Sequence, residues 1–226
     1  MGVEVSSLAF RAPAPTYALL PAAPGGAALR FADGWTPQRG LAQPRSPIRL
    51  LGPAPPGDVA AGLRHELALL PTGAPALHVT HAGGARLTLL FSHGTSFDLG
   101  MLRDHATELA AHTRAHVLAY DYRGYGAAAQ HAPSERAARE DADAALAWLL
   151  ARGTHVHSVV LYGLSLGAAP TMHLAAGAGA GAAGVVLRSG FLSALAVAPW
   201  AGPARCCRAR PLTTRPRPGA PARRCS

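Results

Sequence analysis

A serine framed by glycines is the residue of this sequence best suited to covalent chemistry. Ser165 lies in Gly163-Leu-Ser-Leu-Gly167, after the apolar run 159–161 and before an alanine-rich stretch. Such a turn between a strand and a helix strains the serine backbone and exposes its hydroxyl, and the two glycines support the turn by letting strand and helix pass closely. The helix N-terminus also directs free N–H groups at developing negative charge. The pattern predicts that Ser165 is a catalytic nucleophile, although a chain with 25 glycines can contain the motif by chance.

A second motif lies upstream, where it could stabilise the oxyanion of acyl transfer. The apolar run from Arg86 ends in His93-Gly94 and is followed by Thr95. Acyl transfer needs N–H donors aimed at the tetrahedral oxyanion, typically from the residue after the nucleophile and from a loop that follows a strand. The backbones of Thr95 and Leu166 are the predicted donors, and His93 and Gly94 are predicted to support the loop. The alternative is that His93 only caps a strand end at the surface.

The partners of this nucleophile are missing from the expected place. In hydrolases with a Gly-x-Ser-x-Gly turn the triad follows the chain order serine, acid, histidine. Here no Asp or Glu follows Ser165, the last acidic residue is Asp143, and the only later histidine is His173. Asp121 precedes the serine, and we interpret it as hydrogen-bonding local backbone and not as a displaced triad acid.

Alternating strand and helix patterns must position these residues. Ser134 is expected to cap a helix whose acids form a solvated face: Glu135, Glu140, Asp141 and Asp143. The strand near 184–189, the last one that the sequence predicts, would be an exposed sheet edge. Short apolar runs predict strands near 64–70, 76–81, 86–92, 115–121, 157–162 and 184–189.

Taken together, the motifs resemble a known family. Residues 8–20 are similar to the segment that precedes the hydrolase domain in the alpha/beta-hydrolase domain proteins of family seventeen, the protein depalmitoylases. The resemblance covers about residues 8 to 20 and 62 to 197 of this chain. The matching motifs are His93-Gly94, Asp98-Leu-Gly100, Asp121-Tyr-Arg-Gly-Tyr-Gly126, Ser134-Glu135 and Gly163-Leu-Ser-Leu-Gly167.

This resemblance implies an α/β class and an alpha/beta-hydrolase fold, with a mostly parallel sheet and helices on both faces. The fold would lack its last two strands, which would carry the acid and the histidine. It implies a serine aminopeptidase-like hydrolase that needs no cofactor and cleaves thioester-linked acyl chains from membrane proteins. Acylated membrane proteins would be the substrates, and the expected location is cytoplasmic and peripheral on membranes. Ser165 corresponds to the family's nucleophile, whereas no residue corresponds to its acid or its histidine.

Composition divides the chain into expected parts. A family segment at 1–20 is followed by a Pro/Gly-rich linker at 21–61, a partial hydrolase domain at 62–197 and an Arg/Pro/Cys-rich tail at 202–226, expected to be disordered. The tail has no acid and contributes much of the formal net charge of +9. We interpret it as the product of a frame change, a retained intron or an alternative terminus. The alternative is an arm that binds RNA or an acidic membrane, but no nucleic-acid partner is expected.

The remaining signals concern membranes and metals. Met1-Gly2 to Ser6 fits the N-myristoylation pattern, and an unmodified N-terminus fits equally well. No segment reaches the length of about 18 apolar residues that spans a membrane. The 3 cysteines all lie in the tail and give no disulfide framework. No spacing of metal ligands emerges, so neither a metal nor another cofactor is expected.

Three hypotheses follow for the chain. It is an active serine hydrolase that takes its acid and base from elsewhere, a catalytically dead member that binds acylated proteins through a retained pocket, or a truncated product whose full-length form is the enzyme. We favour truncation for this chain and the hydrolase for the family. Because a serine without a base is nearly inert at neutral pH, the chain is expected to be weak or inactive.

Overall fold

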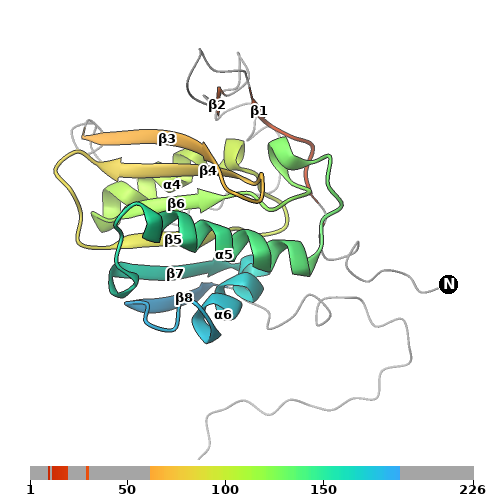
Figure 1. Cartoon of the computed structure of the whole chain (residues 1–226). Helices are drawn as coiled ribbons and strands as arrows, with labels where there is room; N and C mark the ends of the chain where they lie inside the picture. The colour runs from red at the N-terminus through yellow and green to blue at the C-terminus, as the bar shows by residue number, and fades with distance from the viewer. Residues whose placement is uncertain (1–9, 11, 20–28, 31–61, 189–226) are drawn as a thin grey trace, which may run out of the picture.

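The computed structural model describes residues 10, 12–19, 29–30 and 62–188. In that part of the chain a six-stranded sheet has the order β3-β4-β6-β5-β7-β8 (Figure 1). β4 pairs antiparallel with both β3 and β6, and all other neighbouring strands are parallel. The strands are β3 (Leu63–Leu69), β4 (Pro75–His81), β5 (Thr88–Ser92), β6 (His116–Tyr120), β7 (Val159–Leu164) and β8 (Gly184–Arg188).

Helices cover both faces of this sheet. Figure 1 shows α5 (Glu135–Ala151) and α6 (Ala168–Ala176) on one face, and α4 (Leu99–Thr113) behind the other. The predicted α/β class, with a mostly parallel sheet between helices, is therefore confirmed, and each predicted strand matches an observed one to within a few residues. Short elements complete the described chain: β1 (Ala18–Leu19), β2 (Leu29–Arg30) and the 3-10 turns η1 (Gly126–Ala128), η2 (Val156–Ser158) and η3 (Ser165–Gly167).

The side chains of the inner strands alternate between two buried clusters. Leu89 and Phe91 of β5 pack in the cluster on the α4 side, whereas Leu90 packs in the cluster that contains α5 and α6 residues. Successive side chains of a strand point to opposite faces, so a strand buried on both faces is apolar throughout. All five residues of β5 are buried, as this position between β6 and β7 requires.

The helix that follows Ser134 begins as predicted, but its acidic residues are not all solvated. The Ser134 Oγ accepts a hydrogen bond from the Ala137 N–H at 3.1 Å and so caps α5. Asp141 is fully buried, and Arg123 donates to it from its backbone N–H at 2.8 Å and from Nε at 2.9 Å. The predicted solvated face was therefore wrong for Asp141, because this carboxylate fastens the loop after β6 to α5.

β8 is the edge strand of the described sheet, as predicted. Its side chains Val185, Val186 and Leu187 are each more than 40% exposed, at 45%, 43% and 42%. The predicted tail at 202–226 and Gly2 lie outside the described residues, as does most of the predicted linker at 21–61. Within the described ranges, no helix has both the length and the apolar character needed to cross a bilayer.

His78 makes the stability of this domain depend on pH. Its ring packs edge-on against Trp148 of α5, with the ring centroids 5.3 Å apart. Burial, and then the charges of His116 and Arg152, lower the pKa of His78 from 6.5 to about 4. Between pH 6.5 and about 4 the His78 side chain is therefore protonated in the unfolded chain but neutral in the folded domain. The free energy of unfolding consequently decreases as the pH falls from 6.5 towards 4.

Between pH 6.5 and pH 4, the free energy of unfolding of the His78→Gln variant should fall by about 1–3 kcal/mol less than that of the wild-type protein. Urea unfolding at several pH values measures this difference. The same change at the exposed His131 is the matched control and should leave the dependence as it is. A His78→Gln protein with the wild-type dependence would contradict the assignment.

Candidate active site

The chain turns sharply at Ser165, between the end of β7 and the start of α6. Ser165 has a φ of 51°, in the left-handed region that residues with a side chain rarely adopt. Among described residues other than glycine, only Arg114 shares a positive φ. Such strain costs on the order of 1–3 kcal/mol and persists where the surroundings enforce it. The serine is half-buried at the carboxyl end of β7, where the sequence places the nucleophile.

Both glycines of the motif lie where no side chain fits. A Cβ on Gly163 would lie 2.6 Å from the Thr171 Oγ1 and 2.8 Å from the Gly167 carbonyl oxygen. A Cβ on Gly167 would lie 1.9 Å from the carbonyl oxygen of Ser92. The strand, the turn and the end of β5 therefore approach one another so closely that only hydrogen fits between them.

The loop after β5 contacts the serine. β5 and β7 are parallel neighbours, with Ser92 opposite Gly163, so the residues after each strand meet at one edge of the sheet. A Cβ on Gly94 would lie 3.3 Å from the Ser165 Cβ and 3.5 Å from the Leu164 carbonyl oxygen. The structure thus brings together the backbone segments that contain Thr95 and Leu166, the two predicted oxyanion donors.

His93 is a buried part of this loop, so the alternative of a surface cap was wrong. Its side chain has no exposed area, and its Nδ1 lies 2.8 Å from the Gly94 carbonyl oxygen. Because a carbonyl oxygen can only accept, Nδ1 carries the proton. The Tyr122 hydroxyl donates to the His93 carbonyl oxygen at 2.7 Å, and the two rings lie 4.4 Å apart. The loop is therefore held through its histidine ring and its backbone.

Asp121 is the acid of this region, and its partners are distant in the sequence. The Leu99 N–H donates to Oδ1 at 2.9 Å, and the Tyr17 hydroxyl donates to Oδ2 at 2.5 Å. Nε2 of His93 lies 3.3 Å from Oδ1, within ion-pair distance but outside hydrogen-bonding geometry. The interpretation that Asp121 bonds local backbone was wrong, because these partners come from α4, from the N-terminal segment and from the loop after β5.

Burial dominates the electrostatics of this acid. Asp121 is fully buried, and burial raises its pKa above the ordinary value, although His93 and Tyr17 oppose the rise. Burial and the neighbouring Asp121 raise the pKa of Tyr17 far above its usual range, so the tyrosine stays protonated and donates. The signal that could have revealed this pair is the similarity of residues 8–20, which include Thr16 and Tyr17, to the segment that precedes the hydrolase domain.

No histidine of the chain is positioned as a base for Ser165. All 11 histidines lie within residues 62–188, which the structure describes. His93 is the one beside the serine loop, and its two ring nitrogens face Gly94 and Asp121. His173, the only histidine after the nucleophile, bonds Asp143 at 2.8 Å in a contact between α6 and α5. In the described chain an acid and a histidine do pair, but not at the nucleophile.

The described residues contain no group of three or more His, Cys, Asp or Glu side chains that could hold a metal ion.

Comparison with known proteins places this geometry in a family. Residues 89–225 match the model of the alpha/beta hydrolase family, and the match covers β5, the turn at Ser165 and more than half of the chain. The chain belongs to the alpha/beta hydrolase family. The matched region contains the Gly-x-Ser-x-Gly turn and the loop after β5, so the turn lies within a recognised hydrolase sequence.

Curated relatives confirm the resemblance to family seventeen. Alpha/beta hydrolase domain-containing protein 17C of Mus musculus is 38% identical over 123 residues, which are 54% of this chain and 38% of that protein. Protein 17B of Homo sapiens is 38% identical over 117 residues, which are 50% of this chain and 39% of that protein. The chain thus spans less than two fifths of the length of these relatives.

Solved structures with a similar fold include esterases. An esterase from the bacterial hormone-sensitive lipase family is 24% identical, with a TM-score of 0.45, over 63% of this chain and 54% of that chain. The structure of EstE5 soaked with p-nitrophenyl butyrate is 22% identical, with a TM-score of 0.49, over 68% of this chain and 56% of that chain.

Proposed function

We propose that this chain carries the nucleophile half of a serine hydrolase that cleaves acyl thioesters. The observation that carries the proposal is the left-handed Ser165, with a φ of 51°, whose Cβ lies 3.3 Å from where a Cβ of Gly94 would be. A serine held in a strained turn against a glycine loop is the arrangement that acyl transfer uses.

The reaction would proceed in two steps. The Ser165 Oγ attacks the carbonyl carbon of the thioester, the C–S bond breaks, and the thiolate leaves the acyl-enzyme. Water then attacks the ester, which releases the carboxylic acid and restores the serine. In both steps the negative carbonyl oxygen would accept hydrogen bonds from the backbone N–H groups of Thr95 and Leu166.

The described residues place no base where it could accept the hydroxyl proton of Ser165. The hydroxyl proton of Ser165 must pass to a base as the C–O bond forms, and a serine without a base is nearly inert at neutral pH. In the described chain, the ring nitrogens of His93 face Gly94 and Asp121 and not Ser165, and His173 pairs with Asp143. We therefore propose that the chain by itself is a weak catalyst, and that full activity requires an acid and a base from further sequence or from another subunit.

The substrates that we propose are acylated membrane proteins, reached from the cytoplasmic side of a membrane. The relationship to family seventeen supports this substrate class, and myristoylation at Gly2 would bring the site towards the bilayer. A non-catalytic protein that binds acylated partners is the second candidate. The observation that favours it is the absence of a histidine positioned beside Ser165 in the described residues.

Labelling with an alkyl fluorophosphonate tests the proposed function. We expect the 226-residue protein not to label at Ser165 within the time in which a complete serine hydrolase labels fully, because the attacking oxygen keeps its proton. Ser165→Ala is the control for labelling elsewhere. Rapid labelling of the wild-type protein that disappears in Ser165→Ala would overturn the claim that the base is missing, and would show a complete enzyme.

A further inference from the structure

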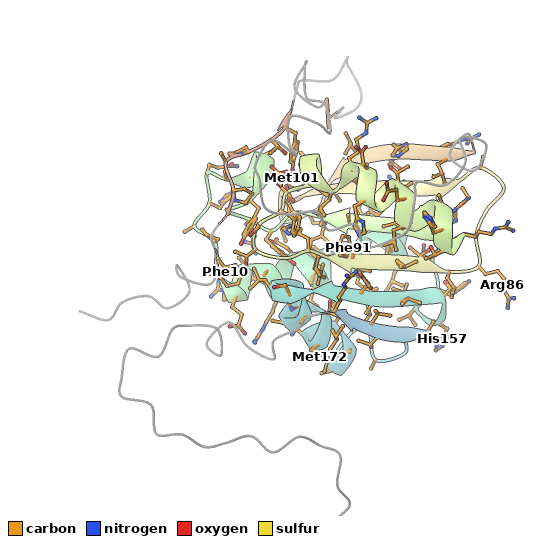
Figure 2. All side chains as sticks on the ribbon, turned by 180° about the vertical axis from the view of Figure 1, so that it is seen from behind. Phe10, Arg86, Phe91, Met101, His157 and Met172 are labelled. Carbon is orange, nitrogen blue, oxygen red and sulfur yellow. The ribbon has the colours of Figure 1, made fainter. Side chains whose placement is uncertain are left out.

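The N-terminal segment lies across the carboxyl edge of the sheet. In Figure 2, Phe10 lies at the opposite end of the sheet from Arg86 and His157, which precede β5 and β7. Phe10 and Tyr17 are both 4% exposed, and each belongs to one of the two buried clusters. The segment is therefore packed into the hydrolase core at the end that holds Ser165, and it is not a loose extension.

Two buried carboxylates fasten this segment. Thr16 donates to Asp98 twice, from its backbone N–H at 2.7 Å and from its Oγ1 at 2.5 Å. The Tyr17 hydroxyl donates to the Asp121 Oδ2 at 2.5 Å. A Cβ on Gly126 would lie 2.0 Å from that same Oδ2 and 2.6 Å from the Tyr17 ring. The fold thus leaves just enough room at Gly126 for the tyrosine to reach the acid.

Asp121 connects the segment to the loop that contacts the nucleophile. Its Oδ1 lies 3.3 Å from Nε2 of His93, whose Nδ1 in turn lies 2.8 Å from the Gly94 carbonyl oxygen. Gly94 lies directly against Ser165. A continuous path of polar contacts therefore runs from Tyr17 to the loop, and every side chain on this path is buried.

We propose that Tyr17 is a positioning residue of the hydrolase site: through Asp121 and His93 it holds the loop at Gly94 and Thr95 against Ser165. This role rests on the proposed function, because it treats that loop as the oxyanion loop. The segment that contains residues 12–19 then belongs to the catalytic domain. A change that detaches it loosens the oxyanion donor at Thr95, while Ser165 and Leu166 stay in place.

Tyr17→Phe is the variant that isolates this role, because it keeps the buried ring and removes only the donor to Asp121. Amide hydrogen exchange, measured by mass spectrometry on the full chain, should accelerate about ten-fold or more in peptides that cover residues 92–98, as expected for the loss of a hydrogen bond to a charged group. Exchange in β7 and α5 should stay unchanged. Tyr162→Phe, at a buried tyrosine on β7 that packs against Phe91, is the matched control.

The second measurement concerns Ser165 itself. With imidazole added as an external base, the maximal rate of labelling by an alkyl fluorophosphonate should fall about ten-fold in Tyr17→Phe, while the probe concentration for half-maximal rate stays the same. Unchanged exchange at 92–98, or an equal acceleration across the whole domain, would overturn the positioning role. Absence of Ser165 labelling in every protein would contradict the proposed function, and the exchange data would still decide the role of Tyr17.

Discussion

Gly167→Ala is expected to destabilise the domain by about 3 kcal/mol or more. The added Cβ would lie 1.9 Å from the Ser92 carbonyl oxygen and 2.8 Å from that of His93. Both atoms belong to the backbone at the end of β5, so no side-chain rotation relieves the clash. The parallel pair β5 and β7 would have to separate at the site itself.

Urea unfolding of the purified variant measures this loss. The matched control is Gly83→Ala, because a Cβ at Gly83 meets nothing within 4 Å. We expect the control to unfold as the wild-type protein does. Wild-type stability in Gly167→Ala would show that the two strands are not held together as closely as the structure indicates.

Thioester hydrolysis by the chain is expected to be about four to six orders of magnitude slower than by a complete serine hydrolase. Removal of triad members has effects of this size and leaves only the rate enhancement due to the oxyanion hole and substrate binding. The difference corresponds to about 5–8 kcal/mol in activation free energy. In this chain the strained Ser165 lies against the loop at Gly94, whereas His173 bonds Asp143 away from the serine.

Hydrolysis of an S-acyl thioester, followed by thiol release, measures that residual rate. A small enhancement over buffer should remain and should be lost in Ser165→Ala. A rate typical of complete hydrolases would contradict the missing base, and a residual rate that persists in Ser165→Ala would show that the nucleophile lies elsewhere.

Local sequence patterns predicted the turn at Ser165 because the constraints on that turn are local. Gly163 and Gly167 are needed within a few residues of Ser165, and the close contacts that require them follow from the turn itself. The strands could be predicted from the sequence as well, because parallel strands buried on both faces appear as continuous apolar runs. The fold class followed from the resemblance of the motifs around these runs to the hydrolase family.

The polar network could not be predicted in the same way, because its members are far apart in the chain. Tyr17 and Asp121 are separated by 104 residues, and their contact depends on how the N-terminal segment crosses the sheet. For Asp141 a signal was present and missed. It lies three residues after Ala138 and four before Ala145, both buried, so helical spacing places it on the inner face of α5.

We propose that Ser165 is a nucleophile and that no base of this chain is positioned to accept its proton. The most direct test is the rate of fluorophosphonate labelling of the full-length protein as a function of added imidazole, with Ser165→Ala as the control. We expect slow labelling without imidazole and an increase with imidazole concentration that Ser165→Ala abolishes. Fast labelling that imidazole does not change would contradict this proposal, and so would a Ser165 that stays unlabelled at every imidazole concentration.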